Sequence, residues 1–265
     1  MPVSTDMLDG GVAVITMSPA ASQNTFSTTN FIPLLTNLEK VMANPSCRSV
    51  VITGTGNFFS SGGNIDDFSD AIDKGDIGQK VQEMTGRLHP LLLKIRTSEK
   101  VFVCAMNGSA AGGGLGLALS CDYRVCSHEA KLPSAFFRLG LSPDGGTTWL
   151  LPRLVGNQIA RKFFFNSEVW SAEQALEYGA VDELSDSEHL MPRSIEVARE
   201  GGKWSLSSWK GTKQLLDAST STFFETQLQF EQSLMVASSQ TKDFTEGVRS
   251  FKNRVEPSFN KSEEE

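Results

Sequence analysis

The stretch NGSAAGGGLGLALSCDYRV occupies residues 107–125 and decides the fold. It follows VFVCAM (101–106), an apolar and β-branched run that predicts a buried strand. Its glycines predict a tight loop, and the leucines and small residues of its second half predict a helix able to lie close against other backbones. Residues 123–126 predict another strand. A strand, a crossover helix and a further strand are typical of an α/β protein.

The same order of elements occurs upstream. Residues 12–17 and 49–53 are short apolar, β-branched runs that predict strands. Apolar residues at helical spacing predict one helix between these strands and a second over residues 78–95, which leads into the strand at 101–106. The repeated cycle indicates a single α/β core built with crossover helices.

The C-terminal part has a different character. After about residue 188 the stretches are helix-like, and no strong strand pattern follows. A region of about 70 residues is short for an independent domain. We therefore expect an α/β core over residues 1–190 and a helical region over residues 191–265 that packs on the core or on another subunit.

The composition excludes several classes of function. The formal net charge of −7, without a basic cluster, argues against binding nucleic acid or an anionic membrane surface. No apolar run approaches the roughly 20 residues that span a bilayer, and the first residues lack the pattern of a signal peptide, so we expect a cytoplasmic protein. The four cysteines lie mostly in apolar stretches without CxxC spacing, which predicts buried reduced thiols and no metal site.

Two glycine-rich loops follow predicted strands, at residues 59–65 (FSSGGNI) and 107–115. A glycine loop that opens a helix presents unpaired backbone N–H groups, and two such loops could direct two amides at one oxygen. Tight turns and close packing are the alternative explanation. Neither loop matches a P-loop or a dinucleotide-binding fingerprint.

Several segments, in this order along the chain, resemble the enoyl-CoA hydratase/isomerase family, also called the crotonase family. They are SSGGNI (60–65), NGSAAGGGLGLALSCDYRV (107–125), FFRLGLSPDGGTTWLLPRLVG (136–156) and SAEQALEYGAVDEL (171–184), and EGVRSFKNRVEPSF (246–259) is similar to the family's C-terminal end. The resemblance implies a crotonase-like spiral of ββα units and a helical C-terminal region that assembles a homotrimer or a dimer of trimers. It also implies an acyl-CoA thioester as ligand and a role in fatty acid metabolism, with no cofactor other than the CoA of the substrate.

The resemblance also implies specific site residues. The backbone N–H groups of Gly63 and Gly113 are expected to form an oxyanion hole. The expected substrate-binding residues are Ser61, Gly63, Asn64, Ile65, Gly112, Phe136 and Leu141, with CoA along the first loop. Asn64 stands where the family commonly has aspartate. Hydratases of the family carry two catalytic glutamates, and the matching positions here are Gly116 and Phe136, neither of which can move a proton.

Asp144 stands where the resembling Δ3,Δ2-enoyl-CoA isomerases place their catalytic acidic residue, between Pro143 and a pair of glycines. A single base can move a proton from C2 to C4 of a 3-enoyl thioester, so one carboxylate suffices for isomerisation. Phe136, Phe137 and Trp149 would exclude water if they line the pocket. The alternative is structural, because an aspartate before Gly-Gly-Thr-Thr suits a helix N-cap.

Three further alternatives stay open. His89, next to Pro90, is predicted to be a half-buried structural histidine. The chain is also similar to 4-chlorobenzoyl-CoA dehalogenases at His89 and Asp144, although those enzymes have tryptophan at the position of Phe136. Another crotonase-type reaction or a catalytically silent acyl-CoA-binding protein would keep the same fold. The sequence leaves the length of the acyl chain undetermined.

Overall fold

The computed structural model describes residues 2–19, 21 and 23–259 and confirms an α/β fold around a mostly parallel sheet. In spatial order the strands are β1 (Val3–Leu8), β2 (Val12–Met17), β3 (Ser49–Thr53), β5 (Val101–Met106), β7 (Tyr123–Ser127) and β10 (Glu183–Ser185). Neighbouring strands are parallel, except that β1 and β2 are antiparallel. The sequence does not predict β1, because VSTDML is mostly polar and exposed, as suits the edge of a sheet.

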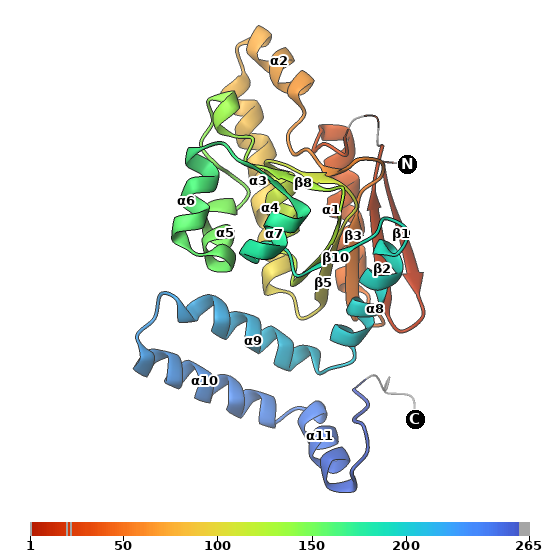
Figure 1. The fold of residues 1–265 in the computed structure, drawn as a ribbon. Helices are drawn as coiled ribbons and strands as arrows, with labels where there is room; N and C mark the ends of the chain where they lie inside the picture. The colour runs from red at the N-terminus through yellow and green to blue at the C-terminus, as the bar shows by residue number, and fades with distance from the viewer. Residues whose placement is uncertain (1, 20, 22, 260–265) are drawn as a thin grey trace.

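Short strands form a second layer. β4 (Phe58–Ser60) pairs in parallel with β6 (Ser109–Ala110), and β8 (Lys131–Pro133) pairs antiparallel with β9 (Val169–Ser171). Successive turns of the chain add a strand to the main sheet, a strand to this layer and then one or two helices (Figure 1). The helices of these turns are α2 (Ile65–Lys74), α3 (Ile77–Thr97), α4 (Gly113–Ser120), α5 (Thr147–Val155) and α6 (Asn157–Phe165). This is the expected spiral of ββα units.

The main sheet is covered on both faces, as its apolar strands require. Along β3, Val50 and Ile52 face a large core cluster that includes residues of α1 (Thr28–Ala43), α3 and α4. Val51 points the other way, into a smaller cluster beneath α8 (Leu190–Gly202). The proposed division at residues 190 and 191 stays a prediction, and α8, which begins there, packs directly on the sheet.

The last helices extend away from the core (Figure 1). They are α9 (Leu206–Ser219), α10 (Phe224–Ser239) and α11 (Lys242–Asn253). α9 is fixed by a buried ion pair, in which Lys213 Nζ lies 3.2 Å from Asp122 Oδ2. Burial lowers the pKa of Lys213 and raises the pKa of Asp122, and the attraction between the two charges opposes both shifts. In the part of the chain that the structure describes, no helix is long and apolar enough to cross a membrane.

Candidate active site

A cavity of about 830 Å³ opens between the second layer of strands and helices α2, α3 and α4. The segment between β8 and α5 forms its far wall. Every site residue expected from the sequence lines this cavity: Ser61, Gly63, Asn64, Ile65, Gly112, Gly113, Phe136, Leu141 and Asp144. The fold therefore brings together residues that are up to about 80 positions apart in the chain.

The two glycine loops lie side by side because β4 and β6 are parallel neighbours. Ser60 is paired with Ala110, and each strand leads directly into its loop. The loops touch backbone to backbone: a Cβ atom added to Gly62 would lie 2.8 Å from the nitrogen of Gly113. Gly62 also has a φ of +83°, so glycine is required there both for the conformation and for the close approach.

The amides of Gly63 and Gly113 are free to bind a ligand. Among the described residues, neither N–H group donates a hydrogen bond. Gly113 is the first residue of α4, where the N–H groups of the first turn have no partner within the helix and the helix dipole favours negative charge. The side chain of Asn64 caps α2, because its Oδ1 accepts from the N–H of Asp67. The geometry suits a pair of donors for one oxyanion.

The turn after Asp144 packs directly on the first turns of α4. Gly145 has a φ of +63°, and a Cβ atom added to it would lie 3.3 Å from Cα of Gly113. A Cβ atom added to Gly116 would lie 2.1 Å from the carbonyl oxygen of Gly145, so no side chain fits at position 116. The same packing that excludes a glutamate at position 116 places Gly145, the residue after Asp144, against Gly113.

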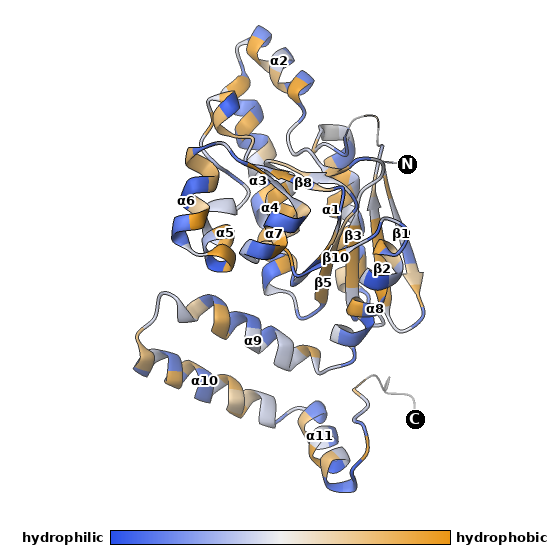
Figure 2. Ribbon diagram, in the orientation of Figure 1, coloured by the Kyte–Doolittle hydropathy of each residue, from blue (hydrophilic) through white to orange (hydrophobic). Residues whose placement is uncertain are grey.

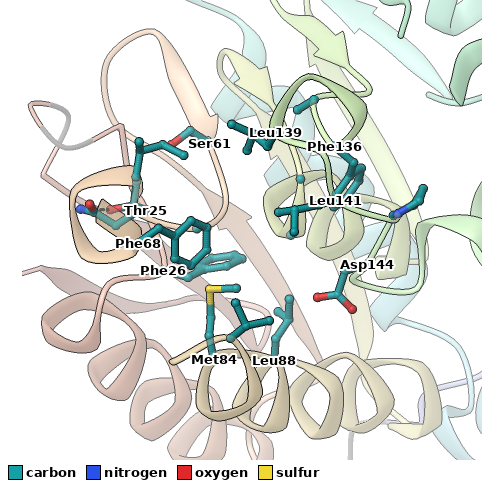
Figure 3. A pocket seen from close by; sticks show the side chains of 18 of the residues that line it. Thr25, Phe26, Ser61, Phe68, Met84, Leu88, Phe136, Leu139, Leu141 and Asp144 are labelled. Carbon is teal, nitrogen blue, oxygen red and sulfur yellow. Dashed lines mark hydrogen bonds between the residues drawn. The ribbon is translucent and has the colours of Figure 1, made fainter. Parts of the chain in front are cut away.

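The side chain of Asp144 does not cap a helix. The N-cap of α5 is Gly146, and no side chain caps this helix. The backbone carbonyl of Asp144 accepts from the N–H and the hydroxyl of Thr147, at 3.3 and 2.8 Å. Its carboxylate points into the cavity, between Leu88 and Leu141 (Figure 3). The N-cap hypothesis for Asp144 is therefore wrong.

The carboxylate of Asp144 contacts His89. The distance between Asp144 Oδ1 and His89 Nε2 is 2.7 Å, and the His89 side chain is 54% exposed. The expectation of a half-buried structural histidine is thus also wrong: His89 lines the cavity. The reason is the helical period of α3, which places residues 81, 84, 85, 88 and 89 on the face toward the cavity.

Apolar side chains form most of the remaining wall. Phe26, Phe68 and Met84 lie on one side, and Leu139 and Leu141 lie across from them (Figure 3). Met84 belongs to the helix predicted over residues 78–95, but its apolar spacing does not mark it as a site residue, and no motif or spacing marks Phe26 or Phe68.

Two aromatic residues near Asp144 in the sequence, which would exclude water if they lined the cavity, lie elsewhere. Phe137 does not line the cavity and is 48% exposed, whereas its neighbour Phe136 does line it. Successive side chains diverge in the 3₁₀ turn Phe137–Leu139. Trp149 instead stacks on the guanidinium of Arg153, 3.6 Å from the ring centre. Exclusion of water from the cavity therefore depends on Phe136 and on the other apolar residues that line it, and not on Phe137 or Trp149.

Cysteine chemistry does not compete with this site. All four cysteines are free and buried, which confirms the expectation of reduced thiols. Burial raises the pKa of Cys121 and of Cys126 to about 12, so neither forms a nucleophilic thiolate near neutral pH. Among the described residues, no group of three or more histidine, cysteine or acidic side chains could hold a metal ion.

The chain is similar to known proteins over nearly its whole length. The family model described as enoyl-CoA hydratase/isomerase matches residues 8–262. A 1,2-epoxyphenylacetyl-CoA isomerase of Escherichia coli is 30% identical over 256 residues, which cover 95% of this chain and 96% of the relative. A probable enoyl-CoA hydratase of Rhodobacter capsulatus is 32% identical and covers 94% of both chains. The crystal structure of an enoyl-CoA hydratase/isomerase from Mycobacterium abscessus superposes with a TM-score of 0.89 at 27% identity, over 97% of this chain and 98% of that one.

Proposed function

The chain belongs to the enoyl-CoA hydratase/isomerase family, and from this membership we propose that it converts 3-enoyl-CoA to 2-enoyl-CoA with Asp144 as acid and base. It is a crotonase-type acyl-CoA enzyme, and the finer question is which reaction its cavity supports. The observation that carries the proposal is the Asp144 carboxylate, which points into the cavity while the next residue, Gly145, packs beside Gly113.

The reaction follows from these groups. The N–H groups of Gly63 and Gly113 donate hydrogen bonds to the thioester oxygen, which stabilises the negative charge that develops there. Asp144 takes a proton from C2, which breaks the C2–H bond and forms a dienolate. The same proton then passes from Asp144 to C4, and the double bond comes to lie between C2 and C3. No cofactor is needed in this scheme, because CoA is part of the substrate.

Hydration fits the site less well. It needs one group to activate water and one to supply a proton. Position 116 has no room for a side chain, and Phe136 places an apolar ring at the other position where the family's hydratases carry a glutamate. Asp66 is the only other carboxylate among the described residues that line the cavity, and it lies exposed in the first turn of α2. We therefore expect isomerisation to be much faster than addition of water.

A second candidate is displacement of halide from an aryl-CoA, and the contact between His89 and Asp144 favours it. In that reaction Asp144 would attack the aryl carbon and His89 would activate water. Phe136 stands where the dehalogenases have tryptophan, which weakens this candidate. A catalytically silent binding protein is disfavoured, because the Asp144 carboxylate is in the cavity and is not used for capping.

The substitution Asp144→Asn tests the proposal. Asparagine has nearly the same size, and the native carboxylate caps no helix, so the fold should persist. Loss of the base should slow turnover of 3-hexenoyl-CoA at least about a hundredfold while the thioester still binds. Asp66→Asn is the matched control and should stay within about threefold of the native rate.

A turnover panel completes the experiment. It contains 3-hexenoyl-CoA, 2-butenoyl-CoA with water addition followed, and 4-chlorobenzoyl-CoA. Native turnover of the first substrate and not of the others supports isomerisation. Retention of most activity by Asp144→Asn would show that the base is another group.

We also propose that the protein assembles as a homotrimer or a dimer of trimers. No residue of α10 is buried, yet hydrophobic residues lie along it (Figure 2). Phe223, Phe224 and Met235 are 86%, 78% and 71% exposed, and Phe251 in α11 is 88% exposed. Apolar area of this kind is typical of a surface that another chain covers. Sedimentation should show a species of three or six chains, and a fully active monomer at micromolar concentration would contradict the proposal.

A further inference from the structure

The contact between His89 and Asp144 joins two separate walls of the cavity. His89 belongs to α3, and Asp144 lies 55 residues later in the turn before α5. A carboxylate can only accept hydrogen bonds, so Nε2 of His89 must carry the hydrogen when Asp144 is ionised. Within the described part of the chain, Nδ1 of His89 has no hydrogen-bond partner.

We propose that His89 is a positioning residue for the reaction: it holds Oδ1 of Asp144, so that Oδ2 faces the carbons between which the proton moves. This role rests on the proposed isomerase function. His89 is not a proton carrier in this scheme. The C2–H bond breaks as the Oδ2–H bond forms, and the Oδ2–H bond then breaks as the C4–H bond forms. His89 keeps its own proton throughout.

Asp144 needs such a partner. Its side chain is 32% exposed, and in the described structure the only group that donates to its carboxylate is His89. The two residues that follow, Gly145 and Gly146, have φ angles of +63° and +70°, which set the course of the turn. Within the described structure no backbone N–H group of this turn donates to the carboxylate, so the turn does not restrain its rotation. A base that must reach both C2 and C4 cannot tolerate this freedom, since a displacement of about 1 Å can cost about a hundredfold in rate.

His89 is well placed to supply this restraint. It extends from a long helix whose adjacent residue, Leu88, is 1% exposed, and Leu91 in the next turn is equally buried. A side chain on a packed helix is held more firmly than one on a loop. Because α3 holds the imidazole firmly, the hydrogen bond from His89 restrains the carboxylate of Asp144.

His89→Leu and His89→Gln test the role. Leucine removes the donor and should lower kcat about tenfold to a hundredfold, with KM within about threefold of the native value. Glutamine offers an N–H donor close to the position of Nε2 and should restore most of kcat. His128→Leu is the matched control: His128 also contacts a carboxylate, Glu173, at 3.3 Å and is similarly exposed, but it lies outside the cavity. It should change neither constant.

Isomerisation in D₂O separates positioning from proton transfer. If His89 only positions Asp144, the native enzyme returns the C2 proton to C4 with little deuterium incorporated, and His89→Leu incorporates more because the loosened carboxyl group exchanges with water. If His89 relays the proton, the native enzyme incorporates much deuterium and His89→Leu incorporates less. The incorporation pattern of a proton relay would overturn the inference. An unchanged kcat in His89→Leu would also overturn it, and so would a failure of His89→Gln to restore activity.

A spectroscopic measurement does not depend on activity. The ¹⁵N chemical shifts of His89 should show a single tautomer with hydrogen on Nε2 in the native protein, and a mixture in Asp144→Asn, because asparagine can both donate and accept. A mixture in the native protein would overturn the inference. An inactive native enzyme with a single tautomer would instead refute the isomerase function and leave the contact established.

Discussion

The two walls of the cavity are built differently. One presents the glycine backbone of Gly63, Gly112 and Gly113. In the packing that supports it, Gly62 lies against Gly113 and Gly145 lies against Gly116, at distances that exclude a Cβ atom or require its neighbours to move. The other consists of side chains that α3 and the segment before α5 project inward, including Met84, Leu88 and Phe136. The first wall offers N–H donors, and the second offers apolar surface with one acidic and one imidazole group.

The difference teaches which changes each wall can tolerate. A wall made of backbone cannot relieve a steric clash, because a backbone carbonyl or amide has no alternative rotamer, whereas a side chain does. A side-chain wall can change its residues and keep the fold, since neighbouring rotamers adjust. We therefore expect substitutions in the glycine wall to affect folding or the chemical step, and substitutions in the side-chain wall to affect mainly binding.

The largest effect is expected for Gly116→Ala. Its Cβ atom would lie 2.1 Å from the Gly145 oxygen, so the turn that carries Asp144 must move away from α4. We expect a loss of at least about 3 kcal/mol in the free energy of unfolding, at the upper end of the range for overpacked cores. Urea denaturation measures it. Native-like stability would show that the Gly145 turn moves freely and that the backbone wall is not rigid.

Gly113→Pro tests the chemical role of the same wall. Proline is tolerated at the first position of a helix but has no N–H group. If this amide stabilises the oxyanion, kcat should fall about 10²–10³-fold in a protein that still folds and assembles. Gly113→Ala keeps the amide, and its Cβ atom meets mainly the end of the Leu88 side chain, at 2.9 Å. Gly113→Ala should therefore retain most of the turnover. Equal losses of kcat in the two variants would show that the Gly113 amide does not stabilise the oxyanion.

The contrast between the walls also explains what the sequence could predict. Clustered glycines after strands indicate exposed backbone at residues 59–65 and 107–115, and the family resemblance singles out Gly63 and Gly113 within these loops. Both residues line the cavity. The strands β2, β3 and β5 were predictable because apolar, β-branched runs are typical of buried strands. The backbone wall is a local property of the chain.

The side-chain wall depends on long-range packing. The contact between His89 and Asp144 spans 55 residues, and no local pattern specifies it. Phe26 and Phe68 come from segments without a motif. Trp149 is close to Asp144 in sequence but lies outside the cavity, because closeness in sequence does not fix the direction of a side chain. The clash between position 116 and Gly145 is likewise visible only in three dimensions.

Phe136→Leu probes the side-chain wall. The ring of Phe136 is 6% exposed and lines the cavity, so the smaller side chain removes apolar contact with the acyl group. We expect a loss of about 1 kcal/mol in the free energy of substrate binding, which corresponds to a rise in KM of about fivefold, and kcat should change little. Phe137→Leu is the control, since Phe137 points away from the cavity. Equal effects at both positions would show that Phe136 acts through the fold and not through the substrate.

The smallest effect is expected for Gly86→Ala. Gly86 lies in α3 between the cavity-lining residues Thr85 and Leu88, and an added Cβ atom would meet no other atom within 4 Å. Both Gly86 and Gly116 are helical, so this substitution adds the same atom as Gly116→Ala without the clash. Alanine reduces the conformational freedom of the unfolded chain and suits a helix, so the free energy of unfolding should rise by about 0.5–1 kcal/mol with turnover unchanged.

Urea denaturation of Gly86→Ala and Gly116→Ala side by side compares the two walls directly. The free energy of unfolding should rise for the substitution at position 86 and fall strongly for the one at position 116. A loss at both positions would mean that α3 is as tightly constrained as α4, and the distinction between a backbone wall and a side-chain wall would fail.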